Sequence, residues 1–261
     1  MATVRSSLPH EDRTAAEPRE NRIESVILSQ IRQINDDIRL LRLSAVDPNH
    51  SIAFSPGQWL DTYIPGIPKA GGFTITSTPR EARPSTHSAP YLELAIQKSR
   101  NPPAQWLWQP EQDILGSRLA VRVGGSFIWP PPQLETSRIN RLVLIAGGVG
   151  IKILFLPRLM DLVAAAESVD VTLNLFLTGS GDAGRIEHGK LPNHTFAGRV
   201  QHADLLSALD GYSRQHHDPN THRAGTVCYV CGPPQMTDDF VEFLSQQRGI
   251  RREHVLCEKW W

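Results

Sequence analysis

The residue pattern of the chain changes at Pro130-Pro131-Pro132, and this change constrains the fold more than any other feature. Over residues 23–100, short runs that alternate apolar and polar residues are separated by turn-forming residues, a pattern typical of an antiparallel barrel. After the prolines, apolar runs alternate with helical patterns, as in a doubly wound α/β domain. Because consecutive prolines form a stiff connector, we predict a disordered tail over 1–20, a β-barrel domain over 21–132 and an α/β domain over 133–261.

The first half contains the signals of short strands and one short helix. Two apolar runs flank the turn signal Asn35-Asp36-Asp37 and predict a hairpin. Prolines suit the first turn of a helix, so we expect a short helix from Pro102-Pro103. The expected strands are Glu24–Ile34, Ile38–Val46, Gln58–Ile64, Phe73–Thr78, Tyr91–Gln97 and Arg118–Val123.

The second half predicts parallel strands joined by helices. The run Arg141–Ala146 is almost wholly apolar, as strands buried on both faces are. Further strands are expected at Val171–Thr178, Thr226–Cys231 and Val255–Trp261. The helices between them are expected from Gly147–Gly150 to about Ala166, at Ala203–Ser213 and at Pro234–Gln247.

Composition excludes several classes of partner. Lysine plus arginine and aspartate plus glutamate both total 27, so no broad attraction to nucleic acid or to an anionic membrane is expected. No window is long and apolar enough to span a bilayer. Three cysteines cannot form a disulfide framework and indicate a reducing compartment. We therefore expect an intracellular protein without nucleic-acid partners or transmembrane segments, and the cytoplasm and the mitochondrion both remain open.

Two cysteine and histidine patterns resemble metal or redox motifs. Cys228 and Cys231 have the C-x-x-C spacing, but they lie in an apolar run that predicts a strand, in which residues three apart point to opposite faces. His216, His217 and His222 share a polar stretch that is better explained as a solvated loop. We expect no metal site.

Glycine-rich turns follow two of the predicted parallel strands. Gly147-Gly148-Val149-Gly150 follows the first, and Cys231-Gly232-Pro233-Pro234-Gln235-Met236 follows another. Glycine lets a ligand approach the main chain, and a helix N-terminus suits a pyrophosphate. Since parallel strands end at one edge of the sheet, the two junctions can face each other across a cleft. The alternative is that each is only a tight connection, with a buried cysteine and a proline-fixed helix start at the second.

Aromatic and hydroxyl residues mark two further candidate elements. The chain ends in Glu258-Lys259-Trp260-Trp261, and large aromatic faces stack on other flat rings. The competing explanation is that both tryptophans seal a domain interface. In the first half, Gly71–Ser77 alternates hydroxyl and apolar residues that could line a ligand, although alone it is an ordinary strand.

Taken in order, these motifs resemble the ferredoxin–NADP reductase superfamily, and most closely the oxidoreductase NAD-binding domain-containing proteins. The resemblance covers roughly residues 23–261 and includes Pro56-Gly57-Gln58-Trp59, which looks like the start of a family strand. It implies a flavin-binding barrel and a nicotinamide-nucleotide domain. It also implies that Phe73 packs along the flavin, that the Thr74 hydroxyl lies near flavin N5, and that Trp260 stacks on the flavin until nicotinamide displaces it.

The resemblance assigns roles residue by residue. The implied catalytic residues are Thr74, Cys231 and Glu258, the last tuning charge or moving a proton unless it forms only a surface salt bridge. The implied cofactor-binding residues are Phe73, Thr74, Ile75, Ser77, Asn101, Gly147, Gly148, Val149, Gly150, Ile151, Lys152, Cys231, Gly232, Pro233, Met236 and Trp260. The implied cofactors are FAD, with FMN open, and NAD(H) or NADP(H).

The chain departs from the family pattern at several places. Gly71 replaces an arginine that pairs with flavin phosphate, so a charge-assisted bond of roughly 1.5–3 kcal/mol is absent there. Phe73 lacks a tyrosine hydroxyl, Ala104 lacks a serine hydroxyl, and Lys152-Ile153 stands where the family has Thr/Asn-Pro. The stretch from Thr178 to Gly198 is short, so we expect a missing element there, and it has no basic cluster for a 2′-phosphate, which favours NADH over NADPH.

Two functions follow from the resemblance and these departures. The first is an NAD(P)H-dependent oxidoreductase that transfers hydride to a bound flavin and passes electrons to an unnamed acceptor, mainly by orienting the rings. The second is a binding module that keeps the fold and holds NAD(H) but has lost turnover.

Overall fold

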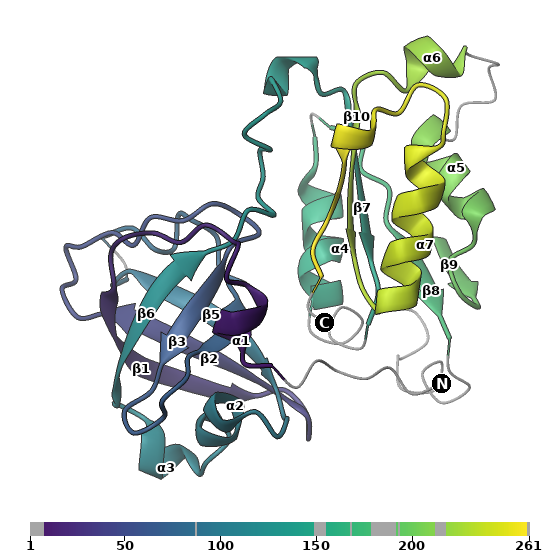
Figure 1. Cartoon of the computed structure of the whole chain (residues 1–261). Coiled ribbons are helices and arrows are strands. Elements are labelled where there is room, and N and C mark those ends of the chain that lie inside the picture. Colours follow the sequence, from purple (N-terminus) through teal and green to yellow (C-terminus); the bar gives the residue numbers. More distant parts are fainter. Residues whose placement is uncertain are drawn as a thin grey trace. The chain divides into compact units, whose positions relative to one another are not determined.

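The structure is a computed structural model that describes residues 8–86, 88–148, 155–167, 169–178, 192, 194–211 and 218–259. It divides into two compact units, one up to Thr136 and one from Ser137 to Lys259 (Figure 1). The division falls shortly after Pro132. The first unit is antiparallel and the second is built of parallel strands and helices, which confirms the predicted fold class.

The described strands of the first unit close into an antiparallel barrel. They are β1 (Glu24–Gln33), β2 (Ile38–Ala45), β3 (Trp59–Tyr63), β4 (Gly71–Thr74), β5 (Tyr91–Gln97) and β6 (Arg118–Gly124). Their hydrogen-bonded order is β4-β3-β6-β1-β2-β5. The barrel closes where Ile75 bridges Leu94 and the Thr76 N–H donates to the Glu93 carbonyl at 2.8 Å.

The barrel interior is filled by the inward side chains that alternate along the strands. The predicted hairpin is confirmed, because β1 pairs antiparallel with β2 and the Asn35 side-chain oxygen accepts the Ile38 N–H at 2.8 Å. Helix α2 (Pro102–Leu107) adds Ala104 and Leu107 to the core, and α3 (Glu111–Ile114), which was not predicted, adds Ile114. Each fully buried aliphatic side chain contributes roughly 2 kcal/mol.

The strand predicted at Phe73–Thr78 is shifted, because β4 begins at Gly71 and ends at Thr74. Its two glycines permit contacts that a side chain would prevent. A Cβ atom at Gly72 would lie 2.1 Å from the His10 ring, and one at Gly71 would lie 2.6 Å from both the Phe73 ring and Pro103 Cβ. Glycine therefore lets two neighbouring groups pack directly against the β4 backbone.

The predicted disorder of residues 1–20 is wrong for the described part, residues 8–20, which we call the docked segment. It begins with helix α1 (His10–Arg13) and then runs antiparallel to β6, where Arg19 bridges Gly124. The Glu20 N–H donates to the Val123 carbonyl, and the Gly125 N–H donates to the Pro18 carbonyl, both at 2.9 Å. The segment is therefore part of the barrel wall.

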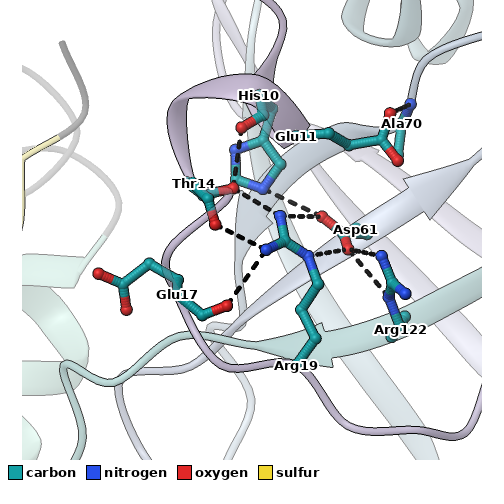
Figure 2. A network of polar contacts seen from close by, with 8 residues as sticks. All are labelled: His10, Glu11, Thr14, Glu17, Arg19, Asp61, Ala70 and Arg122. Atoms are coloured by element: carbon teal, nitrogen blue, oxygen red, sulfur yellow. Dashed lines mark hydrogen bonds and ion pairs between the residues drawn. The ribbon is translucent and has the colours of Figure 1, made fainter.

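A buried ionic network fastens the docked segment to the barrel (Figure 2). The Asp61 side chain on β3 is fully buried. It accepts from Arg19 Nε at 2.8 Å and from Arg122 Nη2 at 2.9 Å, and His10 Nε2 lies 3.2 Å away. Burial raises the pKa of Asp61, but hydrogen bonds from His10, Arg19 and Arg122 outweigh it and lower the pKa to about 2. Asp61 is therefore a charged group with its partners inside the protein.

The second unit contains two groups of parallel strands among its described residues. Strands β7 (Arg141–Ala146), β10 (Thr226–Cys231) and β11 (Val255–Cys257) form one sheet in the order β11-β10-β7. Strands β8 (Asn174–Leu177) and β9 (His194–Ala197) form the other. The helices are α4 (Leu156–Ala165), α5 (His202–Asp210), α6 (Pro219–His222) and α7 (Pro234–Ser245), with 3₁₀ turns at Thr136–Arg138 and Arg252–His254.

One expectation for the second unit is corrected, because the final strand ends at Cys257 instead of Trp261. Of the stretch in which we expected a missing element, the structure describes β9, which pairs with β8, and residues 179–191 lie outside the described chain. The expected start of the helix after the first glycine turn also lies outside it, and the described part of that helix begins at Leu156.

One face of the three-stranded sheet forms the core of the second unit. Val143, Ile145, Cys228 and Val230 pack with apolar side chains of α5 and α7, namely Leu205, Leu209, Phe240 and Leu244. Figure 1 shows α4 on the other side of β7 and β10 from α5 and α7, as in a doubly wound domain. Among the helices that the structure describes, none is both long and apolar enough to cross a membrane.

We expect the Asp61→Asn substitution to lower the free energy of unfolding of the barrel by about 3 kcal/mol, because it removes a buried anion and leaves two partly buried guanidinium groups without it. Urea denaturation followed by tryptophan fluorescence measures this. Asp12→Asn is the matched control, since Asp12 contacts Lys69 at 3.5 Å with both side chains about half exposed, and should cost less than about 0.5 kcal/mol. Equal effects of the two substitutions would contradict the assigned role of Asp61.

The same carboxylate predicts an acid dependence of stability. The folded-state pKa of Asp61 is about 2, against an ordinary value of 3.8. Its contribution, about 2 kcal/mol, is therefore complete above pH 3.8 and is lost as the pH falls through the folded-state value. Urea midpoints measured across this interval should fall more steeply for the wild type than for Asp61→Asn, and parallel curves would refute the assignment.

Candidate functional site

The first unit presents Thr74 at the exposed end of β4. Thr74 is opposite Trp59 of β3 in the strand register, and its hydroxyl is open to a ligand. Phe73 is half-buried against the barrel core, and the Ile75 side chain is buried in it at 7% exposure. The Ser77 hydroxyl accepts the Glu93 N–H at 3.0 Å. Of the four predicted residues on this strand, Thr74 is thus the most accessible, and Ser77 and Ile75 serve the barrel.

The place of the arginine that the family pattern requires is filled. Any side chain at Gly71 would overlap the Phe73 ring and Pro103, as the 2.6 Å Cβ distances show. Asn101 is the N-cap residue of α2, and its side chain makes no capping hydrogen bond. In this structure, Phe73 and the first turn of α2 therefore occupy the space that a side chain at position 71 would need.

The two glycine junctions of the second unit lie at the same edge of its sheet and contact each other directly. Ala146 and Cys231 are opposite each other at the ends of β7 and β10, and the Gly147 N–H donates to the Cys231 carbonyl at 2.9 Å. A Cβ atom at Gly232 would lie 3.2 Å from Gly147 Cα and 2.2 Å from Met236 Cε. Glycine at both positions therefore lets two adjacent backbones approach each other at the carboxyl edge of the sheet, and the Met236 thioether packs against both.

The second junction leads directly into α7. Pro233 is the N-cap residue, and Met236 lies in the first turn, where its thioether contacts Gly147 and Gly232. Cys231 is partly buried at the end of β10, whereas Cys228 is fully buried, and burial raises the pKa of Cys228 to about 12. Cys228 therefore stays a neutral thiol, and Cys231 is the cysteine of this pair that a ligand could reach.

The end of the described chain lies beside α7. Glu258 is partly exposed and follows β11, in which Cys257 is opposite Val230 of β10. Lys259 Nζ donates to Asp238 Oδ1 at 2.6 Å, and this bond raises the pKa of Lys259. Glu258, the carboxylate predicted to act near the flavin, thus belongs to the second unit together with Cys231. Thr74 belongs to the first unit.

Several predicted site residues lie outside the described chain. They are Val149, Gly150, Ile151, Lys152 and Trp260, and the histidines His216 and His217 also lie outside it. His222 is described, and its Nε2 contacts the Asp210 carbonyl at 2.8 Å. Within the described residues, no group of three or more His, Cys, Asp or Glu side chains is placed to hold a metal ion.

Sequence reasoning missed the Asp61 network, although one signal was present. Asp61 interrupts the apolar run Trp59–Tyr63, and an acidic residue in a buried strand requires a cation. The strand register supplies Arg122 directly opposite it. The second cation, Arg19, comes from a segment whose composition predicted disorder.

Comparisons with known proteins agree with this architecture. No family model matches the chain. Oxidoreductase NAD-binding domain-containing protein 1 of Bos taurus is 33% identical over 274 residues, covering 97% of this chain and 85% of that protein. A cytochrome P450 reductase of Amycolatopsis aligns in structure with a TM-score of 0.59 at 21% identity, covering 94% of this chain and 71% of that chain.

A ferredoxin–NADP reductase of Neisseria gonorrhoeae, solved with bound FAD and NADP, has a TM-score of 0.55 at 15% identity. The alignment covers 93% of this chain and 100% of that one. The structural matches establish the fold, and the sequence match establishes the closer relationship. The chain belongs to the family of oxidoreductase NAD-binding domain-containing protein 1 and has the ferredoxin–NADP reductase fold.

Proposed function

We propose that this protein is a flavin-dependent oxidoreductase that takes hydride from NAD(P)H and passes electrons to an acceptor. The observation that carries the proposal is the hydrogen-bonded pair of glycine junctions at the carboxyl ends of β7 and β10. Ligands of open α/β sheets bind outside this edge. The family relationship and the reductase fold support the same reaction class.

The second unit offers the groups that a nicotinamide nucleotide needs. Gly147 and Gly232 carry no side chain of their own, and the Met236 thioether packs against both, so we assign Met236 to contact a nucleotide that approaches this edge. The first turn of α7, which begins at Pro234, directs its free N–H groups toward the same edge. We assign Cys231 to contact the nicotinamide ring, and we prefer NADH because the sequence supplies no basic cluster for a 2′-phosphate.

The first unit offers a reduced set of groups for a flavin. When bound, the flavin supplies the hydride acceptor. We assign the Thr74 hydroxyl to its reactive edge and Phe73 to one face, and we expect Trp260 to cover the ring and Glu258 to tune its charge. Gly71 leaves no room for a phosphate-pairing arginine. We therefore expect the affinity for FAD to come more from contacts with its ring than from contacts with its phosphates, and FMN to be the alternative flavin.

The filled arginine position also favours a second candidate function. If the flavin is not retained, the chain is an NAD(H)-binding module with the reductase fold. The visible absorption spectrum of the freshly purified protein separates the two. Flavin bands that bleach when NADH is added without oxygen support the reductase, and a colourless protein that binds NADH supports the module.

We expect Thr74→Val to lower the rate of NADH-dependent flavin reduction by about tenfold or more, because the substitution removes the hydroxyl that orients the flavin edge. Stopped-flow absorbance measures the rate, and NADH affinity should not change. Thr78→Val is the matched control, since Thr78 is exposed and its hydroxyl bonds Glu81 at 3.2 Å. The role of Thr74 is disproved by equal rates in the two variants.

We expect Gly232→Ala to weaken NADH binding by about tenfold, because the added methyl group displaces the Met236 thioether and presses on the Gly147 backbone. Isothermal titration calorimetry measures the dissociation constant. Adding Met236→Ala to this variant should recover part of the affinity by removing the nearer obstacle. Unchanged affinity in the single variant would place the nucleotide elsewhere.

A further inference from the structure

The docked segment contacts the strand to which the proposed function assigns the flavin. The His10 ring lies against the β4 backbone at Gly72, where a Cβ atom would come within 2.1 Å of it. The Ala70 N–H, immediately before β4, donates to Glu11 Oε2 at 3.3 Å. Residues more than fifty positions apart in sequence are thus in direct contact.

These contacts lie on the face of the sheet that presents Thr74. Gly72 is opposite Asp61 and Thr74 is opposite Trp59, and residues directly opposite each other on neighbouring strands share one face. The His10 ring meets the Trp59 ring edge-on, with centroids 4.5 Å apart. The Arg19 guanidinium lies 5.0 Å from the centroid of the same indole. The register partner of Thr74 is therefore held by the docked segment.

Strand β4 has few other constraints on this face. It pairs with β3 through only four residues, two of which are glycines without side chains, and its link to β5 comes only after its end, where Ile75 bridges Leu94. Glycine gives a backbone more conformational freedom than any other residue. The position of β4 consequently depends on the groups packed against it, and on this face the group at Gly72 is His10.

Hydrogen bonds of Arg19 and Thr14 hold the docked segment in place. Arg19 Nη2 donates to Thr14 Oγ1 at 2.6 Å and Arg19 Nη1 to the Thr14 carbonyl at 2.6 Å, while Arg19 Nε bonds Asp61 (Figure 2). The Thr14 hydroxyl also donates to the His10 carbonyl at 2.8 Å. The guanidinium therefore links the carboxylate in the barrel wall to the turn that carries the imidazole.

We infer that His10, Thr14 and Arg19 are positioning residues of the flavin site. Anchored by Asp61, they fix Trp59 and the β4 backbone, and through these the orientation of Thr74. The inference rests on the proposed function and adds to it a group of residues that precedes the barrel strands in sequence. A role in stability alone would leave the bound flavin unchanged.

The test compares two single variants of the full chain, His10→Ala and Thr14→Val, with the wild type. Asp12→Asn, on the same helix as His10, is the matched control. FAD and FMN are titrated by flavin fluorescence at a temperature where circular dichroism shows each variant folded. The absorption spectrum of the bound flavin and the affinity for NADH are measured on the same samples. We expect His10→Ala to weaken flavin binding by about tenfold and Thr14→Val by about threefold, with shifted flavin bands, and Asp12→Asn to match the wild type.

The outcomes separate this inference from the proposed function. If the wild type binds flavin and both variants bind it equally well with an identical spectrum, the inference is overturned and the proposed function stands. If the wild type binds NADH but no flavin, both fail. If His10→Ala does not fold, Thr14→Val decides, because it removes the hydroxyl that accepts from Arg19 and donates to His10 with little change in the size of the side chain.

Discussion

The charge of Asp61 is the constraint on which the rest of the barrel depends. An ionised carboxylate withdrawn from water costs several kcal/mol unless cations and hydrogen bonds surround it. β6 supplies Arg122 through the strand register, but one cation leaves most of the carboxylate unsatisfied. The remaining donors come from His10 and Arg19, so the barrel wall is complete only when the docked segment is in place. The docked segment, although polar in composition, thereby contributes to the buried ionic network of the barrel wall.

This dependence explains where prediction from sequence succeeded and where it failed. The hairpin of β1 and β2 and the apolar strands β7 and β10 follow from local alternation, turn residues and apolar runs, which report burial directly. Helix α1 has four residues and no apolar face, so its order comes from partners that are distant in sequence. The start of β4 at Gly71 was missed for a related reason, since its two glycines are packed by groups from outside the strand, His10 at Gly72 and Pro103 at Gly71.

The candidate site shows the same division between local and distant information. Parallel strands end at one edge of their sheet, so the sequence alone indicated that the turns after β7 and β10 lie at the same edge, and the bond from Gly147 to Cys231 shows them adjacent. That they enclose a cleft for a nucleotide stays a prediction. The reason for glycine at position 71 was not predictable. A missing arginine in the sequence suggests an empty site, whereas the structure shows a position closed by an aromatic ring and the first turn of α2.

The two findings on the barrel together limit how this protein could hold a flavin. Arg19 and Arg122 both contact β3 beside β4, and both bond the Asp61 carboxylate, so neither guanidinium replaces the absent phosphate-pairing arginine. Under the proposed function, and among the residues that the structure describes near β4, we therefore expect the flavin to be held mainly through its ring and the β4 main chain. Such contacts are short-ranged and depend on geometry far more than an ionic bond does. A site of this kind requires a rigid strand, and we propose that the docked segment supplies that rigidity where the strand's own glycines do not.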